Sequence, residues 1–257
     1  MRPDELVELG EQLVDHGTER GVTLRILGHL AIRHHTQTHR ELIDRLKRVP
    51  THDIDFMGYS KEQNEADRMF KELGYKPDPA VVFSQEYGIK RLIYHHPEVE
   101  IIAEIFLDEL RMAHTLDFRH RLELDYPTIG LVDLLLSKLQ IQQITEKDIQ
   151  DMIALLAEHD LGTGDREVID IGYLLKLTKD DWGLYYTSKT NLEVVREILV
   201  HYEVIDSSTR GNIEKKLDEI DQRMESEPKS MKWKLRAKVG TRVKWYQDVW
   251  DVEDIHR

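Results

Sequence analysis

Apolar residues recur at helical spacing near the start of the chain and then give way to short β-prone runs. Residues 4–20 have the spacing of an amphipathic helix, and residues 22–27 form an apolar run that stops at Gly28. Helical spacing returns over residues 30–46. The pattern therefore predicts a strand joined to a helix through a glycine turn, which brings the backbone N–H groups of a helix N-terminus close to a bound anion.

Further along, β-rich runs are followed by a half of the chain that is helical to its end. Residues 53–57 are expected to form a strand, and three later runs are expected to form an antiparallel meander, at residues 80–83, 90–94 and 99–107. Helices are expected at residues 61–73, 127–140, 145–158, 165–177, 192–202, 209–224 and 230–250. The predicted fold class is α+β, with a mixed sheet and flanking helices in residues 1–124 and a helical domain in residues 125–257.

Composition narrows the protein classes. Hydrophobic residues make up 40% of the 257, enough for a packed core, yet no apolar run approaches the ~20 residues that span a bilayer. We therefore expect no membrane partner. A net charge of −13 argues against a surface that grips nucleic acid as a whole. The absence of cysteine agrees with a reducing compartment and predicts a cytoplasmic protein.

Two acidic residues alternate with apolar ones in the strand expected at residues 53–57. Asp53 and Asp55 should share one face, while Ile54 and Phe56 point to the other. Carboxylates that repel each other in this way suit a hard cation such as Mg²⁺, which binds one or two carboxylates together with substrate phosphates. Solvated acids on an exposed edge strand are the alternative.

A third acid interrupts the apolar run at residues 99–107. Glu104 lies in its middle, and a carboxylate buried there needs a partner. Because residues two apart share a face of a strand, Glu104 should face the same side as Asp108. Glu104 is the predicted third metal-binding carboxylate, with Asp108 as the fallback and a solvent-facing glutamate as the alternative.

The order of strand, Gly28 turn, helix and Asp53-x-Asp55 strand resembles the polymerase-beta-type nucleotidyltransferase superfamily. In that superfamily Gly or Ser usually follows the glycine, where this chain has His29, and the third carboxylate is more often aspartate. Arg48 matches the Arg-x-x-x-x-Asp-x-Asp run of the branch with abortive-infection and toxin enzymes.

The resemblance implies transfer of a nucleoside monophosphate from a nucleoside triphosphate to an unidentified acceptor, either a small molecule, a protein or RNA. It implies two Mg²⁺ ions held by Asp53, Asp55 and Glu104, with Gly28, His29 and Arg48 at the nucleotide. A catalytically inactive nucleotide-binding or regulatory module of the same fold is the alternative.

A lysine and two aspartates carry possible chemistry in the helical half. Lys138 lies on an apolar helix stripe, so its amine must either reach water or meet an anion. Asp148 follows Thr145 at capping-box spacing, and Asp151 lies one turn later. The same superfamily branch has a lysine helix followed by a basic-Asp-x-x-Asp helix, which implies that Lys138, Asp148 and Asp151 contribute to nucleotide binding.

Two further patterns have structural explanations. Histidine pairs such as His35 and His39 suggest a transition-metal site, but solvated or packing histidines explain them better because no metal-hydrolase motif is present. Residues 229–246 mix seven Lys or Arg with aromatic residues. An amphipathic helix packed by its apolar side on the body is the favoured interpretation of this segment, and a patch for an acceptor such as RNA is the other.

Overall fold

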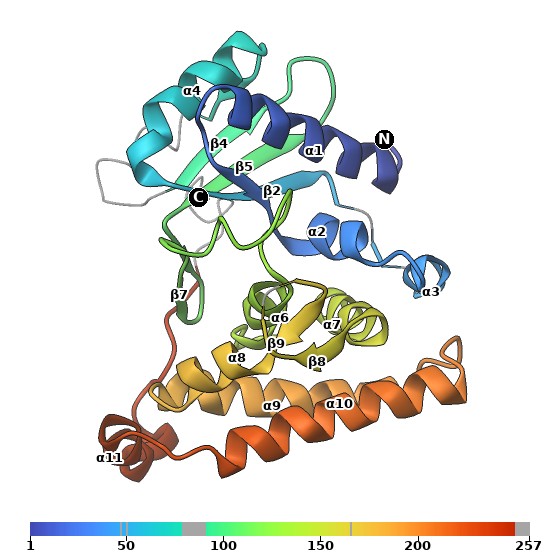
Figure 1. Cartoon of the computed structure of the whole chain (residues 1–257), viewed down its shortest axis with the longest axis vertical. Coiled ribbons are helices and arrows are strands. Elements are labelled where there is room, and N and C mark those ends of the chain that lie inside the picture. The colour runs from blue at the N-terminus through green and yellow to red at the C-terminus, as the bar shows by residue number, and fades with distance from the viewer. Residues whose placement is uncertain (47, 50, 79–90, 165, 250–257) are drawn as a thin grey trace.

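A computed structural model describes the chain except for residues 47, 50, 79–90, 165 and 250–257. It confirms the α+β class, with a mixed sheet and C-terminal helices (Figure 1). The helices are α1 (Pro3–Glu19), α2 (Gly28–His35), α3 (Arg40–Arg45), α4 (Gln63–Glu72), α6 (Leu131–Leu139), α7 (Glu146–Glu158), α8 (Ile171–Thr178), α9 (Trp182–Leu199), α10 (Ser207–Ser226) and α11 (Met231–Val239), with 3₁₀ turns η1 (Ser60–Glu62) and η2 (Gly240–Arg242). The strands are β1 (Leu24–Ile26), β2 (Asp53–Gly58), β3 (Lys76–Pro77), β4 (Arg91–His95), β5 (Ile102–Leu107), β6 (Glu109–Arg111), β7 (Thr115–Asp117), β8 (Asp160–Gly162) and β9 (Val168–Asp170).

The main sheet has the strand order β1-β2-β5-β4-β3. β2 and β5 run parallel at its centre, and the other pairs are antiparallel. The antiparallel pairing predicted between the second and third β-rich runs is confirmed as β4 against β5. The first of those runs, residues 80–83, lies outside the described residues, and the short β3 pairs with β4. The division of the chain at residue 124 stays a prediction.

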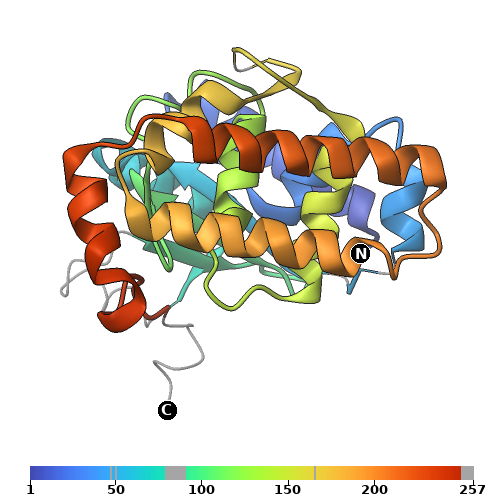
Figure 2. The ribbon, with the colours of Figure 1, turned by 90° about the horizontal axis from the view of Figure 1, so that it is seen from below.

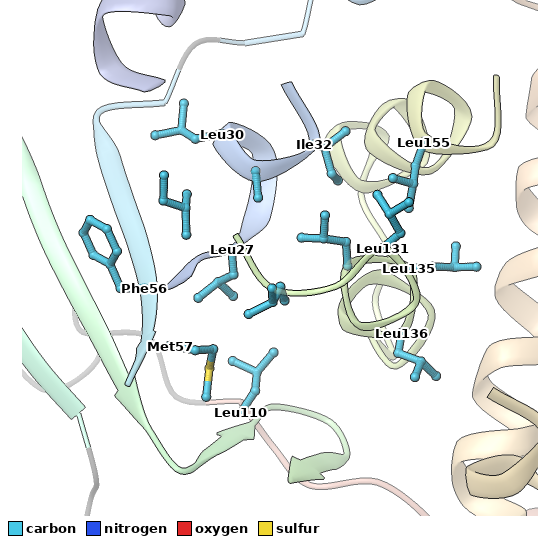
Figure 3. Packing of buried hydrophobic residues seen from close by; sticks show 14 of the residues in the cluster. Leu27, Leu30, Ile32, Phe56, Met57, Leu110, Leu131, Leu135, Leu136 and Leu155 are labelled. Carbon is cyan, nitrogen blue, oxygen red and sulfur yellow. The ribbon is translucent and has the colours of Figure 1, made fainter. Parts of the chain in front are cut away.

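Helices cover both faces of the sheet. Figure 1 shows α1 and α4 on one side, and α2 with the C-terminal helices on the other. Gly10 allows α1 to approach closely, since an added Cβ would lie 3.0 Å from the Ile26 side chain and 3.3 Å from that of Ile54. On the other side, buried side chains run without interruption from β2 through α2 to α6 and α7 (Figure 3). The core therefore fixes β2 relative to the helical half of the chain.

The helix predicted over residues 30–46 is divided into α2 and α3. Glu158, at the end of α7, accepts hydrogen bonds from the backbone N–H groups of Gln37, Thr38 and His39 at 3.2, 2.9 and 2.8 Å. Those N–H groups would otherwise bond within a continuous helix, so the carboxylate stabilises a turn instead. The contact is long-range, which is why local periodicity did not predict the break.

The C-terminal half ends in two long helices that lie side by side, α9 and α10, with α11 at one end of the pair (Figure 2). The prediction of one helix over residues 230–250 was wrong, because α11 ends at Val239. Gly240 has φ of +60°, and the Arg236 guanidinium donates to the carbonyls of Gly240 and Val243 at 2.7 Å each, which folds the chain back. Among the described residues, no helix combines the length and apolarity that crossing a membrane requires.

Candidate functional site

The glycine turn brings the α2 N-terminus against the acidic strand. Gly28 has φ of +71°, a conformation that residues with a Cβ rarely adopt, and an added Cβ would lie 3.1 Å from Asp55 Oδ2. The Leu27 backbone N–H also donates to the Asp55 carbonyl at 2.9 Å. Asp53 lies two residues before Asp55 on β2, so both acids face the α2 side of the sheet. The structure thus places the Gly28 turn against Asp55, with Asp53 on the same face of β2.

The Asp55 carboxyl lies in an environment that disfavours its charge. Burial raises the pKa of Asp55 to about 6, and the neighbouring Asp53 carboxylate adds to the rise. The positive charges of Lys138 and Arg91 lower the Asp55 pKa, but by less than burial and Asp53 raise it. An acid with a raised pKa beside a second acid, at a glycine turn, is typical of a functional site.

Glu104 is the neighbour of Asp55 across the sheet. The two residues are register partners on the parallel strands β2 and β5, and their side chains therefore share a face. The Glu104 carboxylate pairs with the guanidinium of Arg91 on β4, which in turn lies over the Phe106 ring. The predicted third carboxylate is thus beside the aspartates, with an arginine as its partner.

Asp108, the fallback for this position, belongs to a different part of the fold. It follows the end of β5 with φ of +65° and accepts hydrogen bonds from the backbone N–H and hydroxyl of Ser60 at 2.9 and 2.6 Å. Its backbone N–H bonds to Gly58, at the opposite end of β2 from Asp53. The prediction that Asp108 shares the Glu104 face was wrong, because the strand ends and the chain turns before it.

The buried carboxylate of Asp151 contacts three basic side chains that come from separate segments of the chain. Asp151 on α7 has only 1% of its side chain exposed, and it lies 2.7 Å from Arg48 Nε, 2.9 Å from Lys138 Nζ and 2.9 Å from His29 Nδ1. Burial alone would raise the pKa of Asp151, but Lys138, His29 and Arg48 outweigh it and hold that pKa well below its usual range. Asp151 therefore stays ionised and fixes the three side chains in place.

Lys138 is held between both predicted aspartates. Its Nζ lies 3.0 Å from Asp148 Oδ1, in addition to the contact with Asp151. Burial lowers the pKa of Lys138, but the two carboxylates prevail and raise it overall, so the amine is charged. Asp148 also closes the predicted capping box, accepting from the Thr145 hydroxyl at 2.7 Å. Asp148 therefore both caps α7 and pairs with Lys138.

His29 occupies the first turn of α2 with its ring nearly buried. Burial lowers the pKa of His29 below its ordinary value, although Asp151 acts in the opposite direction. The ring is therefore neutral at physiological pH and donates from Nδ1 to Asp151. With Arg48 and Thr51 it also lines a cavity of about 140 Å³ whose apolar walls include Leu30 and Ile43.

Comparison with known families, curated proteins and solved structures gives no match. The function of this site must therefore be argued from its own geometry. Eight residues predicted separately from the sequence connect through these contacts and charge effects: Gly28, His29, Arg48, Asp53, Asp55, Lys138, Asp148 and Asp151. They come from β2, α2, α6, α7 and the segment before β2. Elements distant in the sequence thus build one polar site next to the hydrophobic core.

The carboxylates on β2 are the right kind of ligand for a hard divalent ion, but there are only two of them. Carboxylate oxygens are what Mg²⁺ prefers, and Asp53 with Asp55 meets the minimum of one or two protein carboxylates. Within the described ranges, however, no group of three or more His, Asp or Glu side chains is arranged to hold a metal ion. The pairing of Glu104 with Arg91 accounts for part of this difference from the predicted three-acid site.

Sequence reasoning missed Arg91. It occupies the first position of β4, on a strand next to Glu104, and the need of a buried glutamate for a partner was the available signal. The histidines of the alternative metal site have other partners: His34 pairs with Glu11, His39 with Glu158 and His95 with Asp78. The His34 and His35 rings also meet edge-on at 5.1 Å between centroids.

Proposed function

We propose that this protein is a Mg²⁺-dependent nucleotidyltransferase that transfers a nucleoside monophosphate from a nucleoside triphosphate to an acceptor. The observation that carries the proposal is the contact between the Gly28 turn and Asp55, with the cations of Lys138 and Arg48 close enough to affect the Asp55 pKa. Triphosphate transfer needs phosphate-binding N–H groups, fixed cations and carboxylates for a metal at one place. We assign the activity to the cytoplasm, in keeping with a chain that has no cysteine.

Each group has a distinct part in this proposal. The backbone N–H groups that follow Gly28 would bind phosphate oxygens at the α2 N-terminus. Lys138 and Arg48 would stabilise the charge that develops on the leaving pyrophosphate, since Asp151 holds both in fixed positions. His29 would orient Asp151 and border the nucleotide from the cavity side.

Asp53 and Asp55 would hold the metal, with Glu104 and Arg91 beside them. Mg²⁺, when bound, activates the acceptor oxygen and carries the triphosphate in this class of reaction, with two ions as the expected number. The raised pKa of Asp55 supports a cation here, because bound positive charge would favour the ionised carboxylate. For the same reason metal affinity should fall as the pH drops through about 6.

A nucleotide-binding module without catalysis is the second candidate. It is favoured by the ion pair between Arg91 and Glu104, which occupies the carboxylate that a three-acid metal site would need. Such a module would keep the phosphate contacts of Gly28 and Lys138 and lose the chemistry. The two candidates differ in turnover and agree in nucleotide binding.

Transfer of an α-phosphate label from each nucleoside triphosphate, with Mg²⁺, to fractionated RNA, protein and small molecules tests the proposal. We expect a labelled product from wild type, and a loss of more than about 100-fold in Asp55→Asn. Asp180→Asn, an exposed aspartate in the turn before α9, is the matched control and should keep full activity. If wild type and Asp55→Asn bind nucleotide equally and neither transfers label to any fraction, the non-catalytic module is the correct assignment.

A further inference from the structure

The C-terminal helix α11 is attached to the body by the side that the sequence suggested would face solvent. The Trp233 ring meets Tyr185 of α9 edge-on at 5.2 Å between centroids, and Arg236 lies over the Trp182 ring at 4.8 Å. Lys229 donates to the Glu227 carbonyl at 2.7 Å and lies near the Tyr185 ring. Aromatic and basic side chains therefore hold α11 in place.

The apolar stripe expected to pack on the body is exposed. Of the residues expected in that stripe, Leu235 and Val243 are 59% and 58% exposed, Val239 is also exposed, Tyr246 is partly buried, and Trp250 lies outside the described residues. Met231, one turn before Leu235, is 70% exposed as well. In α11 no side chain is buried. Met231, Leu235 and Val239 lie one turn apart on α11, so they form a solvent-facing apolar stripe about two turns long, and Val243 lies beyond the end of the helix. A contiguous apolar surface of this kind is a candidate interaction surface.

Unpaired cations flank this stripe. Lys232, Lys234, Lys238 and Arg242 are exposed, and none of them has an ion pair with another described residue. Residues 229–249 contain seven Lys or Arg and one acid, Asp248, in a chain of net charge −13. We define the solvent-facing sides of residues 231–243 as the α11 face.

The α11 face is held rigidly before any partner arrives. An added Cβ on Gly183 would lie 2.6 Å from the Trp245 carbonyl, so the segment after α11 is seated directly on α9. The Gln247 backbone N–H donates to the Ala113 carbonyl at 2.9 Å, and Trp245 Nε1 donates to the Thr187 hydroxyl at 3.1 Å. Such preorganisation lowers the conformational entropy that binding must remove.

We propose that the α11 face binds an acidic amphipathic helix of a partner protein. Apolar side chains of that helix would cover Met231, Leu235 and Val239, and its acidic flanks would pair with the unpaired lysines, in the manner of helix-in-groove recognition. The proposal concerns binding alone and does not depend on nucleotidyl transfer.

Other occupants fit less well. Nucleic acid would need exposed rings for base stacking, yet Trp182, Trp233 and Trp245 are engaged with one another or with tyrosines, and the stripe has no counterpart in a phosphate backbone. A second copy paired through its own α11 would place like charges opposite each other. An anionic bilayer would attract the lysines but meet the acidic remainder of the chain as well.

The test uses the full-length protein and a synthetic peptide of about 18 residues, five turns of a helix with leucine along one face and glutamate on both flanks. A scrambled peptide of identical composition is the control. By fluorescence anisotropy at physiological salt we expect the helical peptide to bind at least about tenfold more tightly than the scrambled one. Leu235→Asp with Val239→Asp should remove that preference, and so should Lys234→Glu with Lys238→Glu.

Val200→Asp, at a site 50% exposed beyond the end of α9, is the matched control and should leave binding unchanged. All of these positions are exposed, so thermal melting should show the variants to be folded. Equal affinity for the two peptides overturns the proposal. The proposal is also overturned if single-stranded RNA, or vesicles rich in phosphatidylglycerol, bind more tightly than the helical peptide and the α11-face variants lose that binding.

Discussion

Replacing Asp55 by asparagine should stabilise the fold near neutral pH while it abolishes activity. Asparagine keeps the size of the side chain and cannot ionise, so it removes the cost of holding a charge beside Asp53 in a half-buried position. Most substitutions destabilise, which makes an increase in stability informative. Functional carboxylates are where such a trade-off between stability and activity is expected.

The magnitude follows from the Asp55 pKa. A pKa of about 6 in the folded state, against an ordinary value of 3.8, corresponds to about 3 kcal/mol at about 1.4 kcal/mol per unit. The side chain keeps partial access to water, which reduces this to about 1–3 kcal/mol. For a chain of this size we expect Asp55→Asn to raise the melting temperature by about 3–8 °C.

The sign of the pH dependence is fixed by the raised pKa. Below about pH 4, Asp55 is protonated in the folded and unfolded states, so wild type and Asp55→Asn should be equally stable. Between about pH 4 and 6 the unfolded chain ionises Asp55 while the folded state still holds the proton, so the wild type loses stability relative to the variant, and the loss is complete once the folded state also ionises above about pH 6. The difference should therefore grow between about pH 4 and 7 and stay constant above.

Calorimetry in EDTA at about pH 4, 5.5 and 7.5 measures this difference, with Asp180→Asn as the control for loss of a surface charge. Added Mg²⁺ should narrow the gap at high pH by stabilising wild type more than Asp55→Asn. A variant that melts at or below wild type at about pH 7.5 would refute the argument that Asp55 is held in an environment hostile to its charge. A gap that is equally large at all three pH values would show that the stabilisation has another source.

Two further predictions concern the support of the site. Lys138→Met should destabilise the fold by about 3 kcal/mol, because it leaves Asp151 buried with less compensating charge. The double variant Lys138→Met with Asp151→Leu should recover part of that loss in urea unfolding. If the losses of the two single substitutions simply add in the double variant, the pairing of Lys138 with Asp151 is contradicted. Gly28→Ala should cost about 1 kcal/mol of stability from its φ of +71° and should raise the KM for nucleotide as the new methyl group displaces Asp55. Gly211→Ala, inside α10 with no atom within 4 Å of the added Cβ, should instead stabilise the fold by about 1 kcal/mol and leave the KM unchanged.

Local patterns were sufficient for the parts of the fold that depend on local contacts. The alternation around Asp53 and Asp55 gave the correct strand and face, and the Thr145 capping box gave the start of α7. Contacts between distant segments were not predictable in this way. Glu158 divides the expected helix at residues 37–39 from a distant position in the chain, without changing the local periodicity there. The turn after α11 is different, because Arg236 holds it through short-range bonds to Gly240 and Val243.

The same distinction explains the site. Lys138 had to meet an anion or water because of its place on an apolar stripe, and both Asp148 and Asp151 supply the anion. Arg91 escaped prediction because an arginine at the start of a strand carries no local sign of its partner. Only the register of β4 against β5 places it within reach of Glu104. A buried acid in a sequence thus predicts that a partner exists without identifying it.

The charges that surround the site give an independent argument about its ligand. Five carboxylates and three cations are linked by contact or by their effect on the Asp55 pKa: Asp53, Asp55, Glu104, Asp148 and Asp151, with Arg48, Arg91 and Lys138. His29 is neutral and adds no charge to the group. Lys138 pairs with Asp148 and Asp151, Arg48 with Asp151 and Arg91 with Glu104, and the pKa of Asp55 stays raised although these cations act on it. A divalent cation at Asp55 would favour its ionised carboxylate, and a second ion would depend on the phosphates of the nucleotide, which argues that nucleotide and Mg²⁺ bind together.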